Sequence, residues 1–546
     1  MTSQKKNSIV SQVTLKRRVD AAMGRIPCDL QITDVQYLDV FSCEWRTGTV
    51  SIVDGVIVAL ESGLKAMRQI SGKGKWLVPG FIDAHVHVES SLLTPRNFED
   101  AVLACGTTTA VCDPHELANV LGVEGIQFFL DEAENLNLDL RVMLSSCVPA
   151  TTLETNGGGV IEAAELASLR AHAKALGLAE MMNVPGVVGG DPGILQKLSV
   201  FSDTSIDGHC PLVTGQALSA YASCGISSCH ESSELEEARE KLTKGIAIWI
   251  REGSVAKDLQ NLIPILNEAT SPQIGFCTDD RNPLDIATEG HIDFLVRSAI
   301  ARGVKNTVVY RSASWSVARH YGLRGLGAVA PGYTADLVLL NDADACSISL
   351  VFKAGVPTAE LSAHKHVRVN PKNTVFAKMP TAQELEGIIG QVHVIEVAAA
   401  RILTERSVDA HNAKGVAKLS VLERHGHGFA PANAYVRGFG EQFHGAIASS
   451  VGHDSHNLIA TGDTTENMRV ALAALIDMQG GFSVVQNGKV IAQLALPLGG
   501  LMSGENAKSI EQSLRELHKA THAVGCELPE PFLQLAFLSL PVIPKL

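Results

Sequence analysis

Short apolar runs separated by turn residues occupy residues 31–78. They include "LQITDVQYLDV", "TGTVSIVDGVIVAL" and "GKWLVPG". Asp54-Gly55 stands between "VSIV" and "VIVAL", and an Asp-Gly pair between two such runs is typical of a β-hairpin turn. We therefore predict a small β module here, preceded by a mixed, polar segment (1–30) that forms a helix or a loose arm.

From about residue 78 to 320, short apolar runs alternate with longer segments of helical pattern. The eight runs are "LVPGFIDAH" (77–85), "TTTAVCDPH" (107–115), "RVMLSSCV" (141–148), "GLAEMMN" (177–183), "SIDGH" (205–209), "GISSCH" (225–230), "IAIWIRE" (246–252) and "QIGFCTDD" (273–280). Helix-like segments between them include "VEGIQFFLDEAENL", "AAELASLRAHAKAL", "SELEEAREKLTKG" and "VAKDLQNLIPILNEA". Eight alternations over roughly 240 residues predict an α/β fold, a TIM-like (β/α)8 barrel, with a doubly wound open sheet as the alternative.

Short apolar runs separated by turn residues occur again after the barrel, and a segment of mixed strand and helix pattern follows them. "LGAVAPGYTADLVLLND" and "SISLVFKAGVPT" again indicate hairpins, with a turn at Pro331-Gly332. Because both flanks of the barrel look alike, we predict one composite β-sandwich domain built from both of them. The remainder combines strands ("SVVQNGKVIAQLAL") with helices ("TTENMRVALAALIDM", "NAKSIEQSLRELHKA"), which predicts a C-terminal α+β domain. The predicted divisions are 1–77 (N-terminal arm and first part of the β domain), 78–322 (barrel), 323–365 (second part of the β domain) and 366–546 (C-terminal domain).

Composition and charge indicate a globular protein and argue against some classes of partner. With 46% hydrophobic and 19% charged residues, the 546-residue chain has the balance of a globular protein with a large core. A net charge of −13 argues against nucleic acid as a partner, since phosphate contacts need clustered Lys and Arg. The 11 cysteines include no Cys-x-x-Cys pair, and neither a signal peptide nor an apolar run of 18 residues is evident. We expect a cytoplasmic protein that binds neither nucleic acid nor membrane.

Histidine and acidic residues stand at the ends of most of the eight runs. In chain order they are His85 and His87, Asp113, His115 and Glu116, Glu180, His209, His230, and Asp279 with Asp280. The C-terminal ends of barrel strands converge on one face, so these side chains would crowd together. Unpaired, such a cluster is costly through desolvation and charge repulsion, and divalent cations remove that cost. The joint pattern therefore predicts a metal centre, although each residue alone has an ordinary structural explanation.

The number of candidate ligands suggests two metal ions. The predicted ligands are His85, His87, Glu180, His209, His230 and Asp279. Glu180 would bridge the ions through its two oxygens, and ions about 3.5–4 Å apart would hold a bridging hydroxide. Asp279 would take the proton of that hydroxide and pass it to the leaving group. The protein is thus predicted to be a hydrolase.

Two other motifs leave alternatives open. Cys224, Cys229 and His230 suggest either a thiolate zinc site or buried thiols, and the lack of an evident fourth soft ligand favours thiols. The polar segment His453-Asp454-Ser455-His456-Asn457 either caps an active site, its own or a partner's, or forms a surface loop held by hydrogen bonds.

At "PGFIDAHVHVESS" the chain resembles the amidohydrolase superfamily, and further motifs resemble the bacterial adenine deaminase family within it. These include "VCDPHELANV", "GLAEMMNVPGV", "CHESSELEEAREKL", "CTDDRNP", "VGHDSHN" and "FLSLPVIP". The resemblance runs from about residue 30 to the end. His-x-His marks only the superfamily, whereas "CDPHE", "EMMNVPGV" and "CTDDRNP" together are specific to the family.

The resemblance implies hydrolytic deamination of adenine to hypoxanthine and ammonia in purine salvage. It implies the same six ligands for two divalent metal ions, manganese or iron, with zinc as a further candidate. Glu180 stands where many relatives place a carboxylated lysine. Glu89, His115 and Glu116 are candidates to assist the ring nitrogens, and a homodimer or homotetramer is expected. The alternatives are another amidohydrolase reaction, such as cyclic amide hydrolysis, and a non-catalytic metal- or purine-binding protein.

Overall fold

A single eight-stranded sheet gathers strands from both flanks of the barrel in the computed structural model, which describes residues 10–362, 373–399 and 401–541. Its strands are β1 (Cys28–Asp39), β2 (Glu44–Val53), β3 (Val56–Ala59), β4 (Ala66–Ser71), β5 (Trp76–Pro79), β14 (Leu337–Asp342), β15 (Ser347–Lys353) and β16 (Val356–Pro357). β5 pairs in parallel with β1 and antiparallel with β14, with Leu337 opposite Pro79. The predicted composite β domain thus takes the form of one continuous sheet, because β5 hydrogen-bonds to strands of both flanks.

A hairpin and a helix near the N-terminus match the sequence pattern. β2 and β3 form the predicted hairpin, and Asp54 and Gly55 have φ angles of 51° and 72°, the left-handed values that a two-residue turn of this kind requires. The polar segment before the sheet contains helix α1 (Gln12–Ala22), in which the Ser11 hydroxyl accepts a hydrogen bond from the Thr14 amide.

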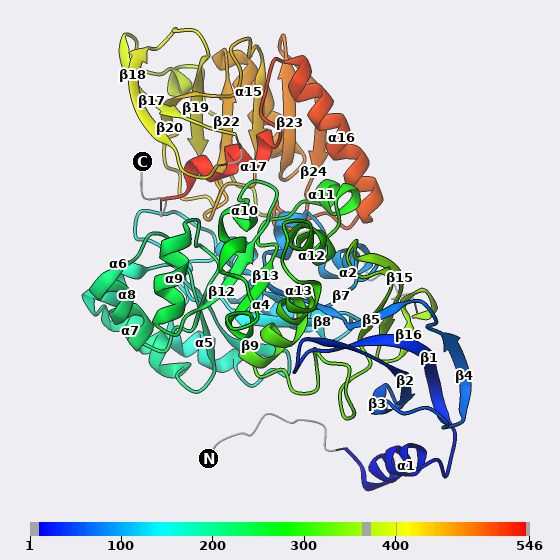
Figure 1. Cartoon of the computed structure of the whole chain (residues 1–546). Coiled ribbons are helices and arrows are strands. Elements are labelled where there is room, and N and C mark those ends of the chain that lie inside the picture. The colour runs from blue at the N-terminus through cyan, green and yellow to red at the C-terminus, as the bar shows by residue number, and fades with distance from the viewer. Residues whose placement is uncertain (1–9, 363–372, 400, 542–546) are drawn as a thin grey trace.

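Eight parallel strands form the centre of the molecule (Figure 1). They are β6 (Phe81–Val86), β7 (Thr107–Cys112), β8 (Asp139–Leu144), β9 (Ala175–Met181), β10 (Ser205–Gly208), β11 (Ser228–Cys229), β12 (Ala247–Arg251) and β13 (Ile274–Cys277). Each predicted run overlaps one of them. β6 to β10 form one ladder and β11 to β13 a second, each in chain order.

Backbone hydrogen bonds join the two ladders at both seams. The Ser227 amide donates to the Ile206 carbonyl at 3.0 Å, which links β11 to β10. At the other seam the Asp279 amide donates to the His85 carbonyl at 3.0 Å, and the His87 amide donates to the Asp279 carbonyl at 3.1 Å. The last strand therefore returns to the first, as a (β/α)8 barrel requires and a doubly wound open sheet does not.

Helices cover the outside of these strands. They include α2 (Pro95–Leu103), α3 (His115–Leu121), α4 (Val123–Ala133), α5 (Ala163–Leu169), α6 (Val184–Gly189), α7 (Pro192–Val200), α8 (Gly215–Ser223), α9 (Leu235–Thr243), α10 (Leu259–Leu262), α11 (Pro283–Thr288), α12 (Ile292–Ala301), α13 (Asn306–Arg311) and α14 (Val317–His320). Two predicted helices are shorter than expected. The helix predicted from Ala163 ends at Leu169, because β9 begins at Ala175. The helix predicted over 255–269 is reduced to α10 and a 3-10 turn (Ile263–Ile265), because Pro264 lacks the amide that an α-helix needs.

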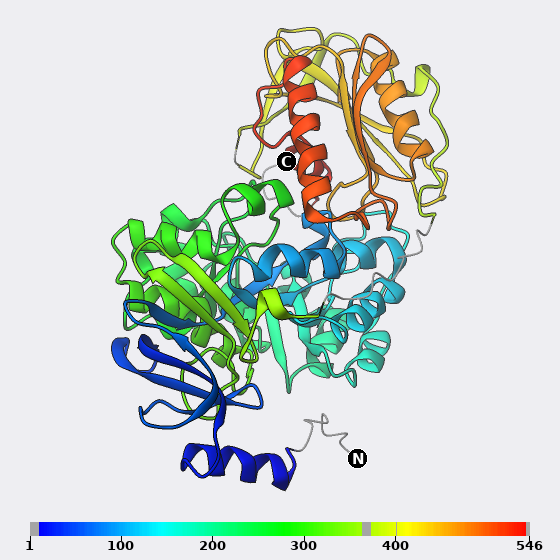
Figure 2. The same cartoon turned by 90° about the vertical axis from the view of Figure 1, so that its right-hand side faces the viewer.

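The last part of the chain forms a second eight-stranded sheet with helices against it (Figure 2). Its strands are β17 (Gln391–Glu396), β18 (Glu405–Ala410), β19 (Val416–Leu422), β20 (Ala432–Arg437), β21 (Ala446–Ser449), β22 (Leu458–Gly462), β23 (Gly481–Gln486) and β24 (Lys489–Ala495), and its helices are α15 (Thr465–Asp477), α16 (Ala507–Ala523) and α17 (Pro531–Ala536). The predicted boundary between residues 365 and 366 lies outside the described residues.

This last domain lies on the barrel, on the side away from α1 and β2 (Figure 1). The Ser503 amide donates to the Leu92 carbonyl at 2.8 Å, and α16 packs on α11 and α2. One apolar core runs through both parts, since buried side chains of β7 and β8 and of β21 and β23 belong to the same cluster. In the part of the chain that the structure describes, no helix has the length and apolar character to cross a membrane.

Candidate metal centre

The six predicted ligands lie together at the carboxyl ends of the barrel strands. His85 lies near the end of β6 and His87 just beyond it, and Glu180 lies near the end of β9. His209, His230 and Asp279 follow β10, β11 and β13 within two residues. Five of the six are buried, and the side chain of His209 is 14% exposed. The alternation that predicted the barrel therefore also places these side chains at one mouth.

Glu180 divides the cluster into two groups. Its Oε1 lies 3.3 Å from Nε2 of His87 and 3.6 Å from Nε2 of His85. Its Oε2 lies 2.7 Å from Nδ1 of His209 and 3.3 Å from Nε2 of His230. One carboxylate thus faces a different pair of imidazoles with each oxygen, which is the geometry of a bridging ligand.

The spacing of the donor atoms fits metal ions. The Nε2 atoms of His85 and His87 are 3.1 Å apart, and Oδ1 of Asp279 lies 3.6 and 3.2 Å from them. Donor atoms held about 2.1 Å from one ion, roughly at right angles to each other, are about 3 Å apart. Nitrogen and carboxylate donors in this number suit a divalent transition metal.

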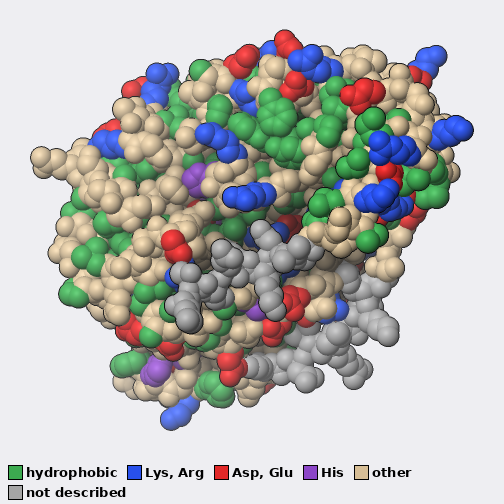
Figure 3. All heavy atoms as spheres, turned by 90° about the horizontal axis from the view of Figure 1, so that it is seen from below, with side chains coloured by type: hydrophobic (Ala, Val, Ile, Leu, Met, Phe, Trp, Pro, Cys, Tyr) green, Lys and Arg blue, Asp and Glu red, His purple; other side chains and the backbone are tan. Residues whose placement is uncertain are grey.

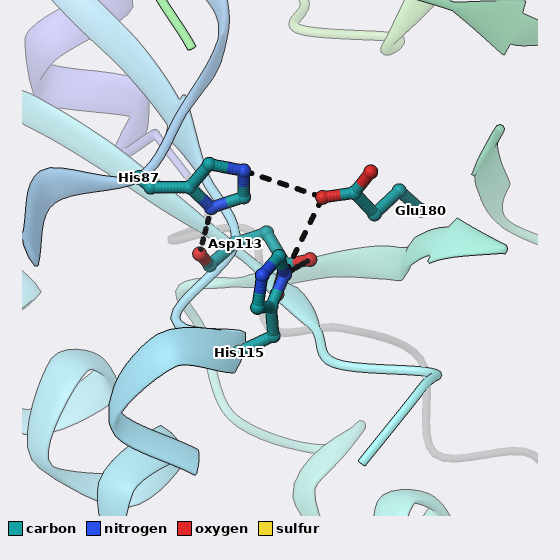
Figure 4. Close-up of side chains that lie close together, drawn as sticks. All are labelled: His87, Asp113, His115 and Glu180. Carbon is teal, nitrogen blue, oxygen red and sulfur yellow. Dashed lines mark hydrogen bonds and ion pairs between the residues drawn. The ribbon is translucent and has the colours of Figure 1, made fainter. Parts of the chain in front are cut away.

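His115 and Asp113 belong to the same cluster (Figure 4). Nδ1 of His115 lies 3.0 Å from Oδ2 of Asp113 and 3.3 Å from Oε1 of Glu180. Nδ1 of His87 hydrogen-bonds to the Asp113 carbonyl at 2.9 Å, which orients its Nε2 toward Glu180. Asp113, which the sequence analysis did not include among the ligands, therefore has its side chain and its carbonyl in the cluster.

A cavity of about 310 Å³ opens beside the cluster. Barrel residues that line it include His87, Glu116, Glu180, His209, His230, Glu231, Arg251, Asp279 and Asp280, and the last domain contributes Ile402, His453, Asp454, Phe537 and Leu540. Of the three candidates for assisting the reaction, His115 and Glu116 line this cavity and Glu89 does not. Glu89 is buried and accepts a hydrogen bond from the Leu117 amide at 3.1 Å. Burial and the charge of Glu116 raise the pKa of Glu89 to about 8.

The polar segment of the last domain caps the chain's own cavity. Nδ1 of His453 lies 2.6 Å from Oε1 of Glu116, and Nε2 of His456 contacts Oε2 of the same carboxylate. Oδ1 of Asp454 lies 3.8 Å from Nε2 of His115. Of the alternatives predicted for this segment, the structure therefore bears out a cap on the site of the same chain.

Arg251 and Glu231 are site residues that the sequence analysis missed. Arg251, the last residue of β12, lies 3.0 Å from Oδ2 of Asp279, 2.9 Å from Oδ2 of Asp258, and in contact with Glu231. Burial alone would raise the pKa of Asp279, but His87 and Arg251 hold it well below its usual value. The signal was present in the sequence, because Arg251 stands near a run end, and the six ligands stand at or near run ends too.

Two family models match the chain, one over the barrel and one over the last domain. The amidohydrolase family model matches residues 76–358, and the model of the adenine deaminase C-terminal domain matches residues 396–546. A protein of Gluconobacter oxydans named adenine deaminase is 46% identical over 550 residues, covering 98% of this chain and 97% of that protein. Adenine deaminase 1 of Agrobacterium fabrum is 45% identical over 97% of this chain and 95% of its own length. Adenine deaminase 1 of Rhizobium meliloti is 46% identical over 97% of this chain and 96% of its own length.

Proposed function

The chain belongs to the adenine deaminase family of amidohydrolases, and from this membership we propose that it deaminates adenine hydrolytically to hypoxanthine and ammonia. The observation that carries this proposal is the likeness to adenine deaminases over nearly the whole length of both chains. The same stretch includes the barrel with its ligand cluster and the last domain that caps the cavity.

We propose that the cluster holds two divalent metal ions. His85, His87 and Asp279 would hold one with Oε1 of Glu180, and His209 and His230 would hold the other with Oε2. Manganese or iron is our expectation, and zinc suits the same donors. When bound, such ions lower the pKa of a coordinated water and so make it a nucleophile near neutral pH.

Asp279 is the group we assign to proton transfer. Its Oδ1 faces the ligand cluster, and its Oδ2 accepts a hydrogen bond from Arg251 at 3.0 Å. The carboxylate is therefore ionised and oriented, so that it can accept the proton of the attacking water and deliver it to the departing amine. Asp279 also lines the cavity in which the substrate would bind.

Glu116 is the candidate we prefer for assisting the purine ring. Attack at C6 places negative charge on the ring nitrogens, which then need a proton or a hydrogen bond. Glu116 lines the cavity, and Oε1 of its carboxylate lies 2.6 Å from Nδ1 of His453. Burial lowers the pKa of His453, but the charge of Glu116 raises it to about 9. Glu89 lies behind the cavity lining, and His115 is held between Asp113 and Glu180.

Other features of the chain support the remaining parts of the proposal. A cavity of about 310 Å³ suits a small substrate such as one purine base. All eleven cysteines are free, which suits a reducing cytoplasm. On the face in Figure 3, Lys and Arg side chains lie among acidic and apolar ones, which gives nucleic acid no broad basic surface there. We also propose a homodimer or homotetramer.

A substrate comparison tests this function. The purified, metal-loaded protein is given adenine, dihydroorotate and hydantoin separately, and ammonia release and ring opening are measured. We expect ammonia and hypoxanthine from adenine and no ring opening. Hydrolysis of either cyclic amide without turnover of adenine would favour the other amidohydrolase reaction. Binding of adenine without ammonia release would favour a non-catalytic purine-binding protein.

A further inference from the structure

The carboxylate of Glu116 has its closest partners in a different domain. Glu116 lies in the first turn of α3 at the barrel mouth. Oε1 is 2.6 Å from Nδ1 of His453, and Oε2 contacts Nε2 of His456. Within the described residues, the barrel contributes one ion-pair contact to this carboxylate, from Nε2 of His115 at 3.5 Å from Oε1. The last domain therefore supplies one imidazole for each oxygen of this carboxylate.

The backbone around His456 determines which of its nitrogens carries a hydrogen. The Gly452 amide donates to Nδ1 of His456 at 3.3 Å, so Nδ1 is an acceptor. A neutral imidazole that accepts at Nδ1 carries its hydrogen on Nε2. Nε2 is the atom that contacts Oε2 of Glu116, so the hydrogen of His456 lies on the ring atom nearest this carboxylate.

His453 is held in place from the opposite side by the end of the chain. Its amide donates to the Ala536 carbonyl at 3.1 Å, and its carbonyl accepts a hydrogen bond from the Ser539 hydroxyl at 3.2 Å. Its ring stacks on Phe537 with centroids 4.7 Å apart and planes 10° from parallel. A further contact ties the segment to the barrel, because the Asn457 side chain donates to Oγ1 of Thr155 at 3.0 Å.

We propose that His453 and His456 are positioning residues, which orient the carboxylate of Glu116 at the cavity and so make the last domain part of the active site. The proposal rests on the role assigned to Glu116 under the proposed function. A carboxylate at the start of a helix has several staggered rotamers, and two fixed partners select one of them.

A double-mutant cycle tests whether the histidines act through Glu116. The proteins compared are the wild type, His456→Ala, Glu116→Gln and the double variant, each metal-loaded and assayed with adenine. We expect His456→Ala to lower kcat by about 10- to 100-fold with little change in KM, because a misplaced acid–base group loses part of its about 10²- to 10⁴-fold effect. In the Glu116→Gln background, the same change should lower kcat by less than about 2-fold.

Three matched variants separate positioning from folding. His456→Asn retains an N–H donor at this position and should recover part of the lost kcat. His453→Gln should lower kcat with unchanged metal content. Ser455 lies in the same segment, but its hydroxyl donates to Glu154 and not to Glu116. The kcat of Ser455→Ala should therefore match that of the wild type.

The proposal is overturned if the fold-losses in kcat of His456→Ala and Glu116→Gln multiply in the double variant. It is also overturned if His456→Ala raises KM and leaves kcat unchanged. Failure of the wild type to turn over adenine would instead contradict the proposed function. In that event the same four proteins are compared by their free energies of unfolding in denaturant, and the effects of the His456 and Glu116 substitutions should be non-additive. Additive effects on unfolding would then show that the contact is not formed.

Discussion

The guanidinium of Arg251 lies 3.0 Å from Oδ2 of Asp279 and leaves Oδ1 facing His87. Two strand ends, those of β12 and β13, thus meet in one charged contact beside the ligand cluster. Arg251 also contacts Glu231 and Asp258, so a single cation sits among three carboxylates. The orientation and the charge of the proposed proton-transfer residue therefore depend on a residue that is not itself a ligand.

Arg251→Met should destabilise the protein on the order of 3–5 kcal/mol, because it leaves buried carboxylates without their cation. Arg251→Lys keeps the charge but loses the planar fork, so it should fold while its kcat falls about tenfold or more. Denaturant unfolding and adenine turnover measure the two effects. Arg251→Met with wild-type stability would show that the three carboxylates do not rely on this cation.

Asp279→Asn should abolish turnover while leaving the metal content largely intact. The amide keeps a donor oxygen for the metal ion but cannot accept and deliver a proton. Ammonia release from adenine and elemental analysis of the same sample give the comparison. Near wild-type rates in Asp279→Asn would mean that another group moves the proton.

Loss of Glu180 should affect both proposed metal positions, whereas loss of His209 should affect one. Glu180 faces His87 with one oxygen and His209 with the other, while His209 contacts only the Oε2 side. We expect Glu180→Ala to bind less than about one ion per chain, and His209→Ala to retain about one. Elemental analysis after gel filtration measures this. Two retained ions in Glu180→Ala would contradict the bridging role.

Glu530 should make stability depend on pH. It accepts a hydrogen bond from Asn282 of the barrel at 2.9 Å, and burial together with the charge of Asp285 raises its pKa to about 8. Between the pKa of the unfolded chain, about 4.3, and about 8, the folded protein keeps a proton that the unfolded chain has lost. Its contribution to stability is thus complete below about pH 4, falls steadily as the pH rises toward 8, and is lost above about pH 8.

Glu530→Gln removes this dependence, because the amide stays neutral at every pH. The variant should gain in Tm relative to the wild type at pH 8, and the gain should shrink toward pH 5. Thermal unfolding of both proteins at the two pH values measures it. A gain that is larger at pH 5 than at pH 8 would contradict the raised pKa.

The barrel and its ligands could be predicted because their signal is local. Each strand is a short apolar run, and a ligand such as His85 or His230 stands at its end. Parallel strands in a barrel bring those ends together, so the order along the chain predicts proximity in space. The proximity of Glu180 to both groups of ligands follows from the same rule.

Contacts between domains could not be predicted in this way. Nothing in the periodicity around Glu116 indicates that its partners are His453 and His456, because that pairing depends on how the last domain packs on the barrel. The continuous β sheet depends on β5 pairing with both β1 and β14, and the pattern of its own short run does not indicate either partner. The helix predicted across Pro264 failed for a local reason, since the apolar spacing outweighed the proline in the prediction.

Metal-dependent turnover of adenine tests the central claim most directly. The purified protein is stripped with a chelator, reloaded with manganese or iron in steps, and assayed for ammonia and hypoxanthine at each metal content. We predict no turnover without metal and a rise that is complete near two ions per chain. Full turnover in the stripped protein, or none from adenine with both positions filled, would contradict the account.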